Sequence, residues 1–408
     1  MDPKFKRLKF ACYTVNITMS IMGNLPPLLF LTFRSLYGIS YSQLGLLVFL
    51  NYSTQLLVDL LFSFFSHRFN IPKTVRRTPV ISFCGLFLYA LSPWLFPGHI
   101  YLSLVVGTMI FSASSGLAEV LISPVIAAIP AKDPDHEMSK LHAVYAWGVV
   151  AVIFISTLFL VLFGARHWSW LVMLMTLVPL TSAILFSRTE IPAMQTPERV
   201  SGALKQLKNK TLWLCVAAIF LGGATEVTMA QWASGYLEQA LGIPKVWGDI
   251  FGVALFSLML GLGRTIYSKV GKHIERILYF GVLGSTVCYF VAAVTPSPIP
   301  GLIACALTGL CTSMLWPGNL IVASDRIPDG GVFLFAMMAS GGDLGASIGP
   351  QLIGLITDTT LTAPWALSLA DTLSVSPEQL GLKLGMLVGM LFPLAAIPLY
   401  RRIWKTRK

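Results

Sequence analysis

The sequence predicts an all-α integral membrane protein with twelve transmembrane helices, arranged as two sets of six. Three observations lead to this fold class. First, 55% of the 408 residues are hydrophobic, only 12% are charged, and the mean hydropathy is +0.74, so the chain is far more apolar than a soluble domain. Second, twelve stretches are long enough to cross about 30 Å of hydrocarbon as helices. Third, the basic residues gather on one side of these spans.

The predicted spans divide evenly around one polar connector. The first six cover residues 9–35, 43–66, 78–96, 100–129, 141–165 and 168–187. The second six cover residues 211–240, 249–270, 273–294, 299–325, 331–358 and 379–400. We therefore expect an N-terminal six-helix bundle in residues 1–187, a cytoplasmic connector in 188–210 and a C-terminal six-helix bundle in 211–408.

The distribution of Lys and Arg gives the orientation. With both termini on one side, 24 of the 29 Lys and Arg residues lie on that side, Arg264 lies within a span, and four lie on the other side: Arg34, Arg166, Lys245 and Lys383. Retained cytoplasmic loops are enriched in Lys and Arg. We therefore expect cytoplasmic termini in a multi-pass protein of the cell (inner) membrane.

The two halves also share short sequence features, as in transporters built from repeats. Gly38-Ile39-Ser40 follows the first span, and Gly242-Ile243-Pro244 follows the seventh. Similarly, Ile129-Pro130 ends the fourth span and Ile327-Pro328 ends the tenth. The two offsets are nearly equal, which favours pseudo-symmetric bundles.

Several classes of function are disfavoured. The net charge of +11 comes from clusters between apolar stretches, so we expect no nucleic-acid partner. The six cysteines lie in apolar segments without a CxxC pair, and neither a disulfide framework nor a metal site is predicted. The chain carries no HExxH or P-loop motif. We expect a transporter rather than an enzyme or receptor, active as a monomer in the lipid bilayer without a cofactor.

Ionisable side chains within spans are costly, by about 3 kcal/mol at the bilayer centre, and usually face a bundle interior or an aqueous cavity. Glu119 lies on one helix face with Ser112, Ser115, Gly116 and Ser123. It is a candidate to bind solute hydroxyls or to carry a coupled proton. The alternative is a structural carboxylate held by a neighbouring helix.

The seventh span offers a second candidate group, Glu226 with Gln231 and Trp232. A carboxylate and an amide beside an indole ring suit a sugar, because its C–H faces stack on aromatic rings and its hydroxyls need polar partners. For Trp232 the alternative is a position in the aromatic belt at the membrane interface.

Span two carries a polar ridge at four-residue intervals, Asn51, Gln55, Asp59 and Ser63. This ridge lines the solute pathway or seals against other helices. Asp343 in span eleven is, like Asp59 and Glu226, a candidate for proton coupling. Further candidates for solute binding are polar or aromatic residues near helix breaks and span ends: Asn24, His142, Trp316 and Asn319.

The layout resembles the major facilitator superfamily over essentially the whole chain. That family's signature turn is degraded here to Arg68-Phe69-Asn70, Lys73 and Arg76-Arg77, with a second imperfect copy at Gly263-Arg264. The resemblance implies two six-helix bundles, alternating access, and gating roles for Arg68, Arg76, Arg77 and Arg264.

Within the superfamily the sequence most resembles the fucose permease-like branch of sugar:proton symporters. The similar stretches are Gly116 to Glu119 with His142, Glu226 with Trp232, and Trp316-Pro317 followed by the glycine-rich span that ends at Gly349-Pro350. The branch has a carboxylate in span one, where this sequence has only asparagines. The resemblance implies a small polar solute, a sugar, moved with protons down a proton gradient. The alternative is an exporter of drug-like or amphipathic solutes.

Overall fold

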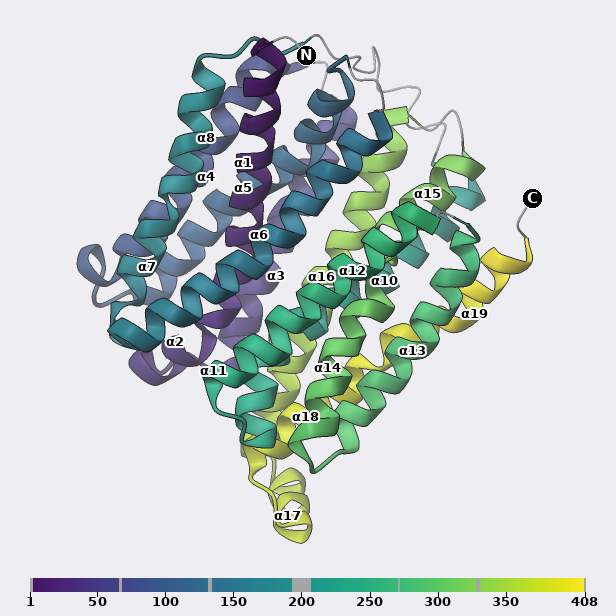
Figure 1. Ribbon diagram of the computed structural model, residues 1–408. Coiled ribbons are helices and arrows are strands. Elements are labelled where there is room, and N and C mark those ends of the chain that lie inside the picture. Colours follow the sequence, from purple (N-terminus) through teal and green to yellow (C-terminus); the bar gives the residue numbers. More distant parts are fainter. Residues whose placement is uncertain are drawn as a thin grey trace. The chain divides into compact units, whose positions relative to one another are not determined.

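The computed structural model describes residues 3–65, 68–130, 134–192, 207–270, 272–327 and 331–406. These residues form helices joined by short loops (Figure 1). Within them, ten segments are long and apolar enough to cross a membrane, and two bent pairs raise the number to as many as twelve. The predicted all-α membrane fold is therefore confirmed.

The helices of the first half follow the predicted spans closely. They are α1 (Pro3–Leu28), α2 (Phe30–Tyr37), α3 (Tyr41–Phe65), α4 (Ile71–Leu95), α5 (Ile100–Ala127), α6 (Pro134–Phe163), the 3₁₀ turn η2 (Ala165–His167), α7 (Trp168–Met175) and α8 (Leu177–Ser187). Span one is bent by 46° between α1 and α2. The bend follows Pro26-Pro27, since proline cannot donate the helical hydrogen bond.

The second half adds a π-helix and an extra short helix. Its elements are α10 (Lys210–Leu241), α11 (Lys245–Trp247), the π-helix η3 (Gly248–Ala254), α12 (Leu255–Val270), α13 (Ile274–Val294), α14 (Pro298–Thr312), α15 (Pro317–Arg326), α16 (Gly331–Thr362), α17 (Pro364–Leu373), α18 (Pro377–Gly389) and α19 (Leu391–Lys405). Helix α17 follows α16 after an 84° bend (Figure 1).

Two helices begin well before their predicted membrane spans because polar residues form the helix ends. Helix α4 begins seven residues before the predicted span, where Asn70 accepts a hydrogen bond from the N–H of Lys73 and Pro72 occupies the first turn. Both features start helices. Arg76 and Arg77 therefore lie on α4 and not in a turn. Helix α6 likewise begins at Pro134, seven residues early.

The chain divides into two compact units. Unit 1 comprises residues 1–26, 50–210 and 329–340, and unit 2 comprises residues 27–49, 211–328 and 341–408. Most of each predicted bundle lies in one unit. The exceptions are the end of span one with the beginning of span two, residues 27–49, and the beginning of span eleven, residues 329–340.

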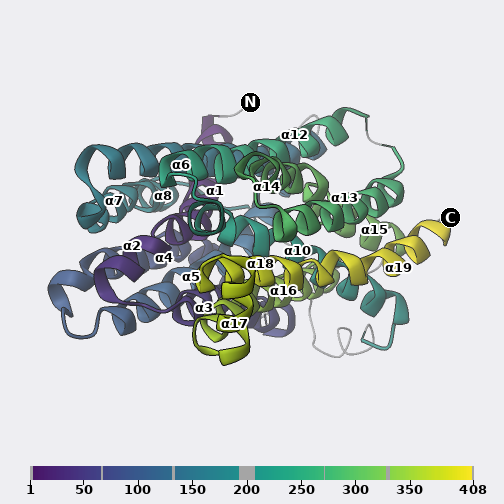
Figure 2. The ribbon, with the colours of Figure 1, turned by 90° about the horizontal axis from the view of Figure 1, so that it is seen from below.

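Each unit has its own apolar core. In unit 1, Leu8 and Cys12 of α1 are buried in one cluster with Ile122 of α5 and Phe186 of α8. In unit 2, the cluster of α10, α13, α15 and α19 includes the fully buried Leu278, and Figure 2 shows α13 beside α19 from a second direction. Large apolar side chains such as those of α6 are also widely exposed, as expected for helices that face lipid.

Candidate functional site

The polar ridge of α3 meets the polar face of α5 inside unit 1. A Cβ at Gly116 of α5 would lie 3.0 Å from Val58 Cβ and 3.1 Å from the carbonyl oxygen of Gln55. These distances are tighter than most contacts of a Cβ atom, so a side chain at this position would push α3 and α5 apart by a few tenths of an ångström. Next to it, Asn51 Oδ1 accepts hydrogen bonds from Ser112 Oγ (2.5 Å) and from Gln55 Nε2 (3.2 Å).

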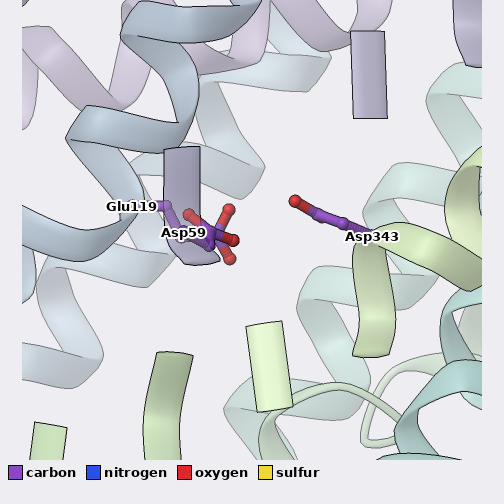
Figure 3. A group of neighbouring side chains, drawn as sticks. All are labelled: Asp59, Glu119 and Asp343. Carbon is purple, nitrogen blue, oxygen red and sulfur yellow. The ribbon is translucent and has the colours of Figure 1, made fainter. Parts of the chain in front are cut away.

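This close packing brings two acidic side chains together. A carboxylate oxygen of Asp59 lies within 4.8 Å of one of Glu119, and Figure 3 shows the two side chains next to each other. Asp59 is fully buried, whereas Glu119 keeps partial exposure. Two carboxylates this close in an apolar bundle do not readily ionise together, so the pair is suited to hold one proton.

Unit 2 contains an ion pair between two spans. Arg264 of α12 donates from Nη2 to Oε1 of Glu226 on α10 at 3.3 Å, and from Nε to the carbonyl oxygen of Ser313 at 3.0 Å. The other carboxylate oxygen of Glu226, Oε2, is buried without a hydrogen-bond partner in the described part of the chain. The site therefore offers one acceptor and further guanidinium donors to a polar molecule.

Trp232 is engaged with protein rather than open to a solute. Its side chain is 1% exposed, and Nε1–H donates to the carbonyl oxygen of Pro350 at 2.9 Å. Its ring lies 5.7 Å from Phe30 and 5.9 Å from Tyr41, between ring centroids. Its neighbour Gln231 is also buried.

Trp316 and Asn319 lie at the break between α14 and α15, and Pro317 occupies the first turn of α15. The ring of Trp316 covers Gly342 so closely that a Cβ there would lie 2.4 Å from a ring carbon. Asn319 is buried and donates to Tyr400 Oη and to the carbonyl oxygen of Leu315, each at 2.5 Å. In this conformation both side chains pack against other helices of unit 2.

The other predicted residues lie on several different helices. Asn24 donates to the carbonyl oxygen of Ser20 at 3.0 Å in α1, and Asp343 is buried on α16 in unit 2. The side chain of His142 lies outside the described residues. Of the predicted gating residues, Arg76 donates to the carbonyl oxygen of Thr189 at 2.9 Å. The Arg68 guanidinium lies 5.4 Å from the Phe65 ring centroid. Arg77 is exposed. The fourth, Arg264, pairs with Glu226.

Comparison with known families decides the class of protein. The model of the Major Facilitator Superfamily matches residues 10–350, most of the chain. The chain belongs to the major facilitator superfamily. It is accordingly a multi-pass membrane transporter by family, and the resemblance predicted from the sequence is confirmed.

Solved structures of this superfamily share the fold of the chain. An inward-facing, occupied bacterial homologue of the human lysosomal transporter Spinster has a TM-score of 0.74 at 14% identity, covering 100% of this chain and 98% of that one. A D-xylose-proton symporter has a TM-score of 0.74 at 14% identity, covering 98% and 99%. The E. coli fucose:proton symporter has a TM-score of 0.58 at 17% identity, covering 95% and 98%. The curated proteins give no match.

This major facilitator transporter also has a polar cluster that the sequence did not reveal. It joins the end of span one and the beginning of span two to α16 and α18, all in unit 2. Glu378 accepts from Tyr41 Oη at 2.5 Å and lies 3.4 Å from Arg34 Nη2. Asp358 accepts from the N–H groups of Tyr41 (3.2 Å) and Ser42 (2.7 Å). These amides open α3, where helical partners are missing and negative charge is favoured.

One sequence signal marks the same region. Gly38 has φ = 67° and ends α2, and Gly242 has φ = 65° just after α10. Both glycines therefore adopt the left-handed conformation that stops a helix. The two matching Gly-Ile segments correspond to equivalent turns, but the residues that surround them come from distant parts of the sequence.

Proposed function

We propose that this transporter moves a small polar solute, a sugar, together with protons by alternating access between its two six-helix bundles. The observation that carries the proposal is the Asp59–Glu119 carboxylate pair within the apolar unit 1. Intramembrane acids are rare, and they commonly mark proton or substrate pathways.

The carboxylate pair supplies the proton-binding group. One shared proton reduces the pair to a single negative charge, and loss of this proton restores repulsion between two charges. Asp59 is enclosed, while Glu119 is partly exposed, so we assign proton exchange to Glu119. Asp59 then acts as the neighbouring charge, in a protein whose span one lacks a carboxylate.

The Glu226–Arg264 pair supplies groups that can bind a polar solute. Glu226 Oε2 is a buried acceptor, and leaving it without a partner costs free energy that a solute hydroxyl would recover. Arg264 uses Nε and Nη2 in its hydrogen bonds to Ser313 and Glu226, so other N–H groups of the guanidinium remain for solute oxygens. The xylose-proton and fucose:proton symporters among the structural neighbours agree with this class of solute.

Helix α3 contributes residues to both units, so alternating access must change its contacts. Its first residues, up to Phe49, belong to unit 2, and its remainder belongs to unit 1. We expect the contacts of Asp358 and Glu378 with the beginning of α3 to break once in each transport cycle. Hydrogen bonds to charged groups contribute about 1.5–3 kcal/mol each, so these contacts stabilise the conformation in which they are formed.

Counterflow in proteoliposomes tests the proposal. Purified protein is reconstituted, loaded with one unlabelled solute from a panel of sugars, and diluted into a trace of the same labelled sugar. We expect at least one sugar to give transient accumulation. If no sugar exchanges while hydrophobic cations do, the protein is an exporter of drug-like solutes instead. Hydrolysis or group transfer without flux would point to an enzyme.

A further inference from the structure

A surface pocket of about 550 Å³ lies between α13 and α19 in unit 2. Its walls combine two kinds of side chain. Tyr279, Ile397 and Pro398 form an apolar part, and the remaining wall is basic, with Arg401, Arg402 and Lys405. This combination suits a ligand that is anionic at one end and apolar at the other.

The three basic side chains are available to a ligand. Arg401, Arg402 and Lys405 are all exposed. Each of the ion pairs found among the described residues involves other cations: Arg34, Lys245 and Arg264. Three neighbouring positive charges without a carboxylate partner create a local field that attracts an anion.

The end of α19 is held in place, so the pocket is formed before a ligand arrives. Arg326 at the end of α15 donates from Nη1 to Thr406 Oγ1 at 3.0 Å and from Nη2 to the carbonyl oxygen of Ile403 at 2.6 Å. Thr406 also lines the pocket. Fixed walls reduce the entropy lost when a ligand binds.

Aromatic residues place this pocket at the membrane surface. The ring of Trp404 lies 5.3 Å from Tyr279 and 6.1 Å from Phe280, between ring centroids. Trp and Tyr gather at the level of lipid headgroups. Along the same helices, Phe280, Leu391 and Leu394 are exposed, as expected for surfaces that contact acyl chains.

We propose that this pocket binds an anionic phospholipid from the surrounding leaflet. Its headgroup phosphate lies among Arg401, Arg402 and Lys405, and an acyl chain follows Ile397, Pro398 and the exposed apolar face beyond them. Basic pockets at the ends of membrane helices recognise such headgroups. The inference concerns regulation or stability by lipid and does not depend on the identity of the transported solute.

Native mass spectrometry of purified protein with added phosphatidylglycerol or phosphatidylcholine tests this site. We expect tight retention of phosphatidylglycerol and little retention of phosphatidylcholine. Each removed cation should weaken binding about fivefold, so the triple substitution Arg401→Gln, Arg402→Gln, Lys405→Gln should lose most of the bound lipid. A matched variant removes three exposed lysines elsewhere in the chain (Lys210→Gln, Lys269→Gln, Lys272→Gln) and should retain it.

Two further measurements separate the site from general charge and from misfolding. The double variant Arg401→Lys, Arg402→Lys keeps both charges and should retain the lipid, and gel filtration checks that every variant folds. Equal loss of lipid from both triple variants would overturn the site, as would retention by the pocket variant. Glycerol phosphate or inorganic phosphate that protects against unfolding as well as phosphatidylglycerol would show a soluble-anion site and overturn the lipid assignment.

Discussion

Replacing Glu119 by Gln tests the proton-coupling role of the carboxylate pair. The two carboxylates lie within 4.8 Å of each other. At an effective dielectric constant of about 20, two unit charges at this distance repel by about 3.5 kcal/mol, which disfavours the doubly ionised pair roughly 400-fold. The neutral amide of Glu119→Gln removes this repulsion, so the shared proton of the carboxylate pair is lost. The shape and polarity of the site remain similar.

The assay compares uphill accumulation with counterflow in proteoliposomes. One proton moved down a gradient of one pH unit supplies about 1.4 kcal/mol, enough for about tenfold accumulation of a co-transported solute. We expect the parent to approach this ratio, Glu119→Gln to fall to about one, and both to exchange solute in counterflow. The control Glu275→Gln, in the first turn of α13, should behave like the parent. The comparison is made from about pH 5.5 to 8, a range in which a carboxyl group with altered proton affinity would change its charge. Equal accumulation of solute by Glu119→Gln and by the parent across this range would refute the proton-coupling role of Glu119.

Three other substitutions test the packing and the moving parts. Gly116→Val should separate α5 from α3, lower the unfolding free energy by about 1–3 kcal/mol in thermal or denaturant unfolding, and reduce coupling; unchanged stability would contradict the close contact. Trp232→Phe should leave the buried carbonyl of Pro350 without its donor and lower the unfolding free energy by about 1–3 kcal/mol. Loss of solute affinity at unchanged stability would instead support a role of Trp232 in stacking on the solute. The amide of Ser42 and the carboxylate of Asp358 lie 2.7 Å apart, so a short bifunctional methanethiosulfonate reagent should join the two cysteines of the variant Ser42→Cys, Asp358→Cys. Counterflow should then stop and return with dithiothreitol, while the parent, with its own cysteines, is unaffected by the reagent. Continued transport by the cross-linked variant would show that the two segments need not separate.

Much of the fold follows from the sequence because the bilayer imposes simple rules. Each span must be apolar over about 20 residues and must satisfy its backbone hydrogen bonds within a helix. The predicted span 211–240 accordingly coincides with α10, Lys210–Leu241. Hydropathy fails at polar helix ends, where Asn70 caps α4 well before the apolar residues begin. It also misses α17, a short helix with an exposed Trp365.

The site was only partly predictable, since helical spacing places residues on a face without naming the opposite face. The sequence identified Asp59 and Glu119 separately, and the contact at Gly116 brings them together. It assigned Arg264 to a gate by resemblance, and the ion pair of Arg264 with Glu226 was not predicted. The interactions of Asp358 with the first amides of α3 join residues more than 300 positions apart, and no local pattern indicates them.

Proton movement that accompanies solute entry tests the central proposal most directly. Proteoliposomes in weakly buffered medium, with a pH-sensitive dye outside and no imposed gradient, receive each sugar of the panel in turn. We predict that a transported sugar makes the outside medium more alkaline in the parent and leaves it unchanged with Glu119→Gln. Sugar entry without any proton movement in the parent, or proton movement driven only by hydrophobic cations, would contradict the account.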